Sequence, residues 1–206
     1  MTTSGGGPPP DEVSRRREAA IAGHVGDADA ARAHLADPAP SVRATALGAL
    51  ARCGGLTPDD LEAALADRAP AVRSRAAELA ATRPGDRRPA LAGALADPDP
   101  TVVEAAAWAS GERRPAESGV VAVLAAVTVD HDDPLCREAA VAALGSLGDP
   151  AGLPAILTAT GDRPAVRRRA VLALAPFAGP EVDAAIERAL ADRDWQVRQA
   201  AEDISR

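Results

Sequence analysis

The chain of 206 residues is 47 % apolar and carries a formal net charge of −7. This balance argues against nucleic acid as the default partner, because an acidic protein repels phosphate backbones on average. The two cysteines, Cys53 and Cys136, lie far apart in the sequence. Their spacing excludes a disulfide framework or a zinc-type site and fits a reducing, cytoplasmic environment.

Aromatic residues are nearly absent, with two Trp, one Phe and no Tyr. A core without aromatics must be built from Ala, Leu and Val, which favours closely packed helices. No apolar run reaches the roughly 18 residues that a membrane-spanning helix needs. The composition therefore predicts a helical protein that does not enter a membrane.

Residues 1–10 include three Gly followed by three Pro and cannot bury apolar surface, so we expect a disordered tail there. They also lack the basic start and the apolar stretch of a signal peptide. Residues 11–24 have helical spacing and predict a single helix. The chain after it is repetitive, and we expect one repeat domain over residues 11–206.

Six segments share a pattern in which an acidic residue and usually a Pro precede an apolar residue that Arg follows in most of them. We call this apolar residue the anchor; successive anchors lie 30 to 34 residues apart, the length of a two-helix unit. Ala occurs four positions after every anchor, which predicts a close helix contact at the same place in each unit. The anchors are Val42, Val72, Val102, Cys136, Val166 and Val197, and the Ala residues are Ala46, Ala76, Ala106, Ala140, Ala170 and Ala201.

Each unit is predicted to contain two helices. Before the anchor, apolar residues recur at helical spacing, as in Leu61, Ala64 and Leu65. A Pro two positions before the anchor suits the first turn of the second helix, where its missing N–H costs nothing. Together with the helix over residues 11–24, the pattern predicts thirteen helices and no strands.

An Asp followed five and six residues later by Val-Arg resembles the HEAT repeat, in the short bacterial form called the phycobilisome-lyase HEAT-like repeat. The resemblance implies an all-α, right-handed α-solenoid of about six stacked two-helix repeats preceded by a lone helix. The third repeat departs from it with Val103 in place of Arg, and the fourth has Cys136 at its anchor. Tetratricopeptide repeats have a similar period but need bulky aromatics that this chain lacks.

The sixth position after the anchor is predicted to be exposed, because its residues are too varied for a core: Gly48, Glu78, Trp108, Ala142, Leu172 and Asp203. Residues four apart share a helix face, so Glu104, Trp108 and Glu112 are predicted to form one exposed stripe. The HEAT resemblance implies that second helices line a concave surface.

The candidate binding site is Trp108 with a ring of acidic residues around it. An exposed, central Trp is typical of a binding hot spot, and the Glu residues favour a protein or peptide that offers Arg or Lys around an apolar contact. The alternative is that Trp108 fills a gap against a neighbouring helix. Trp195, near the last anchor, is predicted to pack and close the final repeat. The ring consists of Glu78, Glu104, Glu112 and Glu138.

The Arg residues that follow the anchors allow two interpretations. They could form a ligand-binding row, or each could pair with turn Asp residues and carbonyls and tie neighbouring units together. The resemblance implies the second. The residues are Arg43, Arg73, Arg137, Arg167 and Arg198.

No catalytic, metal or cofactor site is predicted. HEAT-like deoxyhypusine hydroxylases bind two irons through His-Glu dipeptides, and this sequence has none. The acidic run Asp130–Asp133, which contains His131, is interpreted as a capping turn because a metal site needs ligands from more than one element. We expect that the chain is not an enzyme.

The leading functional hypothesis is a non-catalytic, monomeric scaffold or adaptor that binds a partner protein or peptide on its concave face. A HEAT-like DNA glycosylase, with Trp108 and Glu112 as its candidate residues, or a DNA-binding protein is an alternative, although an acidic groove opposes phosphate contacts. A phycobilisome-lyase-like, cofactor-handling protein is a further alternative from the resemblance alone.

Overall fold

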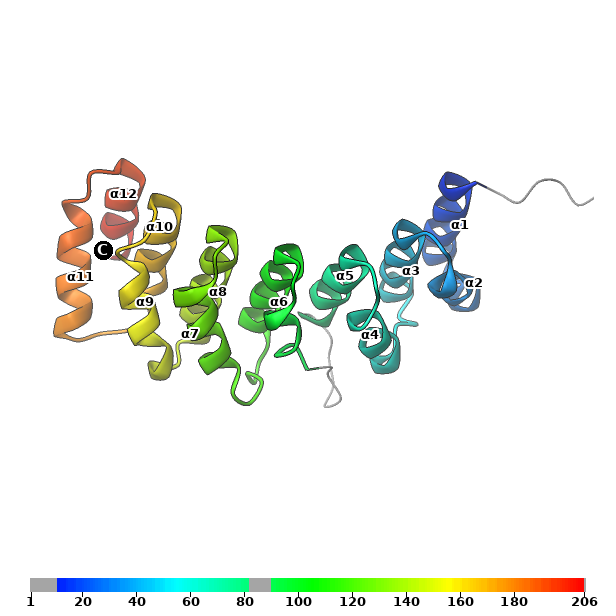
Figure 1. Cartoon of the computed structure of the whole chain (residues 1–206), viewed down its shortest axis with the longest axis horizontal. Coiled ribbons are helices and arrows are strands. Elements are labelled where there is room, and N and C mark those ends of the chain that lie inside the picture. The colour runs from blue at the N-terminus through cyan, green and yellow to red at the C-terminus, as the bar shows by residue number, and fades with distance from the viewer. Residues whose placement is uncertain (1–10, 82–89, 206) are drawn as a thin grey trace, which may run out of the picture. The chain divides into compact units, whose positions relative to one another are not determined.

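The computed structural model describes residues 11–81 and 90–205, and these residues form helices without any strand (Figure 1). The predicted tail over residues 1–10 lies outside them. The elements are α1 (Glu12–Val25), α2 (Ala28–Ala33), η1 (His34–Ala36), α3 (Pro40–Arg52), α4 (Pro58–Leu65), α5 (Pro70–Ala81), η2 (Ala94–Ala96), α6 (Pro100–Glu112), α7 (Val120–Asp130), α8 (Pro134–Leu147), η3 (Pro150–Gly152), α9 (Leu153–Ala159), α10 (Pro164–Ala173), α11 (Pro180–Leu190) and α12 (Trp195–Ile204).

Five of the second helices begin at the Pro two positions before the anchor, as predicted. Pro is favoured at the first helical position because its missing N–H has no partner there and its φ already suits the helix. An Asp caps two of these five helices, since the Asp99 and Asp133 side chains accept the backbone N–H of Thr101 and Leu135. Proline therefore sets the start of the five helices, and an Asp cap reinforces it in α6 and α8.

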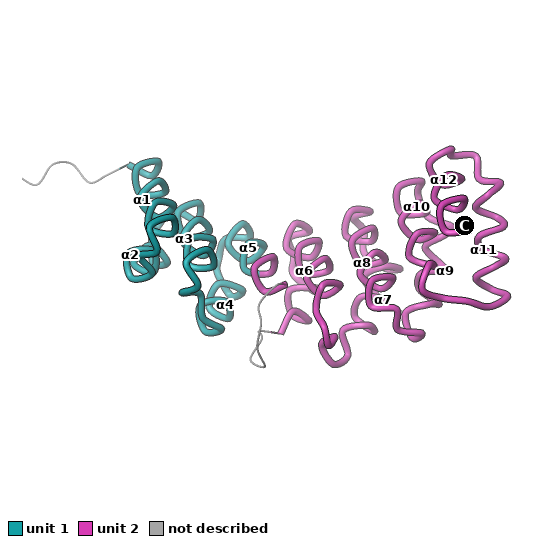
Figure 2. Tube along the Cα trace, turned by 180° about the vertical axis from the view of Figure 1, so that it is seen from behind, with its two compact units in different colours: residues 1–76 teal, residues 77–206 magenta. Residues whose placement is uncertain are grey.

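The chain divides by its internal contacts into two compact units, one ending at Ala76 and the other beginning at Ala77 (Figure 2). In unit 1, α1 packs on α2 and α3. In unit 2, the second helices α6, α8, α10 and α12 each pack on the next, while α7 packs on α8 and α9. The predicted stack of two-helix repeats with a lone helix before it is confirmed.

The number of helices differs from the prediction. Twelve α-helices occur within the described residues, and the first helix expected in the third repeat is reduced there to a single turn and η2. Leu95 N–H still reaches the Leu91 carbonyl in an α-type bond, but the next bonds have the shorter 3-10 pattern.

Small residues allow the second helices to approach closely. The Ala four positions after each anchor is fully buried in all six repeats. Two glycines carry the approach further, because a Cβ on Gly111 would lie 2.8 Å from the Ala143 Cα, and a Cβ on Gly145 would lie 2.6 Å from the Ala173 Cα. The backbones of α6, α8 and α10 therefore meet with no room for a side chain.

We expect Ala106→Leu to destabilise the protein by about 1–3 kcal/mol, because extra methylene groups cannot be accommodated at a fully buried helix contact. The midpoint of chemical denaturation gives the measurement. Ala126→Leu on the exposed side of α7 is the matched control and should be nearly neutral. Equal effects of the two substitutions would show that the Ala pattern merely reflects composition.

Gly145→Ala should lower the free energy of unfolding even though Ala is favoured over Gly in helices by about 1 kcal/mol. The new Cβ would meet the α10 backbone, which cannot move aside as a flexible side chain can. Gly48→Ala is the control, since its Cβ would meet the end of the flexible Arg75 side chain, whose terminal guanidinium nitrogen would lie 3.0 Å away. We expect that control to be neutral or stabilising, and a stabilising Gly145→Ala would contradict the proposed contact.

Candidate functional site

Helix α6 is buried almost entirely, except along one stripe. Between Val102 and Gly111, only Glu104 and Trp108 are exposed, and the exposed Glu112 continues the same line at the end of the helix. The Trp108 residue is 47 % exposed. The predicted stripe is therefore present, and its Trp is accessible to solvent rather than enclosed in the core.

A groove of about 450 Å³ lies between α6 and α8 beside this stripe. Trp108 lines one side, and the exposed Leu135 at the start of α8 lines the other. Gly111 and Ala143 also line the groove, at the point where the two backbones meet. The close helix contact that stabilises the stack therefore also shapes the groove.

The three Glu side chains around the groove differ in whether they pair with an Arg. Within the described residues, neither the Glu104 nor the Glu112 carboxylate forms an ion pair or a hydrogen bond. Glu138 accepts from Arg169 at 3.4 Å and lies 3.8 Å from the Arg168 guanidinium. Two carboxylates consequently remain available to a cationic ligand at the edge of an apolar depression.

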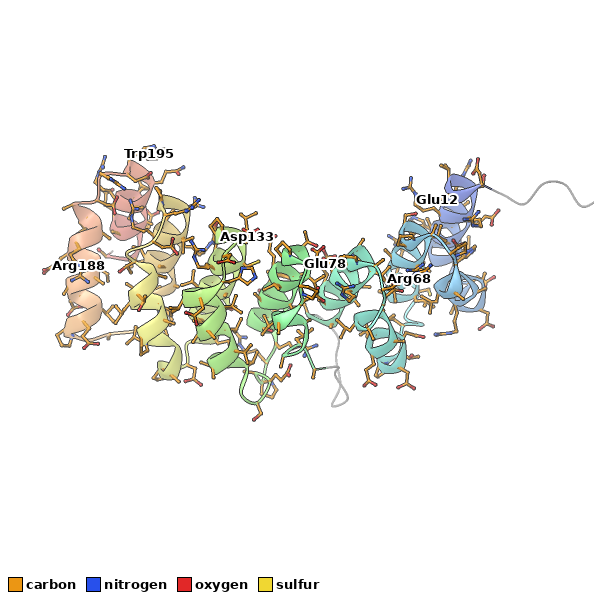
Figure 3. All side chains as sticks on the ribbon, viewed as in Figure 1. Glu12, Arg68, Glu78, Asp133, Arg188 and Trp195 are labelled. Atoms are coloured by element: carbon orange, nitrogen blue, oxygen red, sulfur yellow. The ribbon has the colours of Figure 1, made fainter. Side chains whose placement is uncertain are left out.

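Four of the five residues predicted for the site line this one groove: Glu104, Trp108, Glu112 and Glu138. Glu78 does not line it and lies on α5 (Figure 3). The repeat register places Glu78 at the same helical position as Trp108. The register alone does not show which pair of helices has a groove between them.

Sequence reasoning did not identify Leu135 and Arg169, which complete the groove. Leu135 precedes its anchor directly, where the other repeats have only small or polar residues: Ser41, Ala71, Thr101, Ala165 and Gln196. A large apolar residue at a position that is otherwise small or polar is a usable signal of surface function.

The prediction that Trp195 packs to close the last repeat is wrong. Trp195 is 64 % exposed at the start of α12 (Figure 3), and the buried anchor beside it is Val197. Trp195 instead lines a groove between α10 and α12 together with Arg168 and Leu172. Its position at the first residue of a helix places the ring outside the buried face.

The Arg residues after the anchors have the structural role that the resemblance implied. The nearly buried Arg43 donates to both carboxylate oxygens of Asp67 in the next repeat, at 2.8 and 2.6 Å, and to the Asp37 carbonyl at 2.8 Å. The hydrogen bond from Arg43 lowers the pKa of Asp67. Such bidentate pairs consume the donors that a ligand would need. The arrangement recurs at Arg15–Asp37, Arg137–Asp162 and Arg167–Asp192.

This series of ion pairs is interrupted between α6 and α8. Val103 replaces the Arg, and His131 occupies the place of the paired Asp in the following turn. His131 Nδ1 accepts the Asp133 N–H at 3.0 Å, just as the Asp67 side chain accepts the Ala69 N–H in its own turn. The turn therefore keeps its internal hydrogen bond but lacks the ion pair with the preceding repeat, at the step that contains the groove.

The remaining reactive groups have ordinary surroundings. Burial raises the pKa of the Cys136 thiol to about 11, which keeps it neutral. Asp133 and His131 cap their turn, as predicted for the acidic run. Within residues 11–81 and 90–205, no three His, Cys, Asp or Glu side chains gather as metal ligands would. None of the helices in these segments has the length and apolar character to cross a bilayer.

Comparison with protein families matches residues 58–143 and 121–204 to the family model for HEAT repeats. No curated protein sequence gives a significant match. Three similar solved structures are the Escherichia coli protein YibA, human deoxyhypusine hydroxylase and a designed armadillo repeat protein.

The three similarities lie in the fold. YibA is 17 % identical with a TM-score of 0.63, covering 95 % of this chain and 74 % of its own. The hydroxylase, solved with glycerol, is 21 % identical with a TM-score of 0.50, covering 97 % and 84 %. The designed protein, solved with the peptide (KR)4, is 14 % identical with a TM-score of 0.51, covering 94 % and 89 %.

The expectation that the chain is not an enzyme is corrected by this comparison. Deoxyhypusine hydroxylase is an enzyme by its name, and it shares the stack of helical hairpins. A fold of this kind supports catalysis when suitable side chains line it, so the repeat architecture gives no reason to exclude an enzymatic role.

Proposed function

The chain belongs to the HEAT-repeat family, and we propose that it binds a segment of another protein in the groove between α6 and α8. The segment offers Arg or Lys side chains around an apolar residue. The observation that carries the proposal is a half-exposed Trp108 in a groove edged by two carboxylates that form no ion pair within the part of the chain that the structure describes. The surface involved belongs to the second helices, the side that the resemblance predicts to be concave.

The charge of the groove favours a basic partner. Neither Glu104 nor Glu112 pairs with a cation among residues 11–81 and 90–205, and the like charge of the two side chains creates a local negative potential that attracts Arg and Lys. The same potential opposes a phosphate backbone. A designed armadillo repeat protein with this fold was solved with the peptide (KR)4, which supports the idea that a surface of stacked helices accommodates a basic peptide.

The apolar part of the groove favours an aliphatic or aromatic side chain between the basic ones. Trp108 and Leu135 face solvent on its two sides, and the depression of about 450 Å³ is large enough for a side chain of the partner. Burial of a Trp at the centre of an interface is a frequent source of binding energy. The contact with Trp108 should therefore govern how long the complex persists.

A partner captured by pull-down should bind Trp108→Ala about thirtyfold more weakly, since loss of a central Trp often costs about 2 kcal/mol or more. Val129→Ala, which removes exposed apolar surface from α7, is the matched control and should bind normally. Titration calorimetry gives the affinities and thermal melting reports the fold. Normal binding together with a much lower melting temperature for Trp108→Ala would assign this Trp to packing and refute the site.

The double variant Glu104→Gln/Glu112→Gln should slow association and leave dissociation nearly unchanged, because attraction between rim charges acts mainly on encounter. The difference from the parent should shrink as salt rises from about 0.1 M to 1 M, where the screening length falls from about 10 Å to about 3 Å. Glu181→Gln/Glu187→Gln on α11 makes the same change in net charge away from the groove. If this control slows association equally, overall charge and not the groove attracts the partner.

A further inference from the structure

We propose that the partner segment makes a second, uncharged apolar contact with Trp195 in the groove between α10 and α12. The inference rests on the proposed function and extends it from one apolar contact, at Trp108, to two. It concerns unit 2 alone, in which α6, α8, α10 and α12 pack in sequence.

Both tryptophans of the chain are exposed on this row of helices. Trp108 is 47 % and Trp195 is 64 % exposed, although Trp is the residue type with the largest apolar area to gain from burial. The core uses Ala, Leu and Val in their place. The two Trp side chains are consequently surface features, and Trp is the residue type most enriched at binding hot spots.

Three consecutive grooves connect the two tryptophans. The first, between α6 and α8, contains Trp108, and the third, between α10 and α12, contains Trp195 in a depression of about 220 Å³. The middle groove, between α8 and α10, measures about 450 Å³ and has Leu172 and Pro176 in its lining. Leu172 also lines the third groove, so apolar surface continues between the last two.

The charge of the surface differs between the two ends. The first groove has the carboxylates of Glu104 and Glu112, which no described residue pairs, whereas the third has one basic residue, Arg168, and one acidic residue, Asp203. Basic side chains of a partner therefore gain from the first groove but not from the third. The matching segment has Arg or Lys around its first apolar residue and none around its second.

The spacing of the helices sets the distance between the two apolar residues of the partner that contact Trp108 and Trp195. Packed helices lie about 8–10 Å apart, so two steps from the first groove to the third cover about 16–20 Å. An extended chain advances about 3.3 Å per residue. The second apolar residue should follow the first by about five or six positions.

Synthetic peptides test the spacing without changing the protein. A short probe contains Arg-Leu-Arg, and longer probes add a second Leu at about three, six or twelve positions after the first, through Gly-Ser linkers. A Ser in place of the second Leu gives the control peptide. The Leu at six positions should raise the affinity at least about fivefold over the Ser control, since hot-spot contacts exceed about 1 kcal/mol. The Leu at three positions cannot reach and should give no gain, and the longest linker should give a smaller one.

The gain from the second Leu should vanish in Trp195→Ala and persist in Leu190→Ala, a matched loss of exposed apolar surface on α11. Trp108→Ala should weaken the short and long probes alike. Suppose that the short probe binds through Trp108 but the second Leu gives no gain in affinity, or gives a gain that Trp195→Ala retains. The inferred contact at Trp195 is then overturned, and the proposed function stands. If the short probe does not depend on Trp108, the proposed function fails as well.

Intrinsic fluorescence gives a readout that keeps Trp195 in place. The chain has two Trp and no Tyr, so Trp195 is the only strong emitter in Trp108→Phe. The probe with Leu at six positions should shift its emission to shorter wavelength and protect it from acrylamide, while the Ser control should not. Saturating binding of the six-position probe without any change at Trp195 would overturn the inference.

Discussion

The close contact between successive second helices is the constraint on which the rest of the structure depends. Ala106 and its five counterparts are fully buried, and Gly111 and Gly145 let neighbouring backbones touch. Because small residues occupy these contact positions, neighbouring helices approach closely, and larger apolar side chains such as Leu47 and Leu144 are buried beside them. Beside this contact, shallow grooves lie between α6 and α8, between α8 and α10, and between α10 and α12. What the protein can bind is then decided by the few larger side chains along the rims.

The Arg–Asp pairs add orientation to this contact. Arg43 and Arg167 are nearly buried and each bonds both oxygens of an Asp in the next repeat, so their charges are fully compensated where they leave water. A bidentate pair tolerates little rotation and holds one repeat in register with the next. The step from α6 to α8 lacks such a pair, with Val103 and His131 in the two places. Apolar packing, the close contact at Gly111 and hydrogen bonds such as that from the Ser146 hydroxyl to the Gly111 carbonyl orient the helices at this step.

The repeat pattern predicted the fold well because the signals are local. Pro at the first helical position, the spacing of the anchors and the buried Ala all act within one repeat, and α1 was recognisable as an unpaired second helix. The stripe of Glu104, Trp108 and Glu112 was predictable for the same reason. The groove was not, since Leu135 and Arg169 reach it from other helices and their contribution depends on how neighbours pack. The fold likewise gave no basis for excluding catalysis, because activity depends on particular side chains.

The residues of the stripe are difficult to explain by stability alone. Many acidic side chains of the described residues cap a helix or pair with an Arg. Glu104 and Glu112 do neither within this part of the chain. Glu112 is the last residue of α6, where a negative charge opposes the helix dipole and costs about 0.3–1 kcal/mol. Trp108 between them leaves apolar surface in water. Two locally unfavourable choices, Trp108 and Glu112, on one helix face are expected where a sequence meets a requirement other than folding. Each becomes favourable once a basic and apolar segment covers the groove, because the ligand then supplies the missing cations and the missing apolar contact.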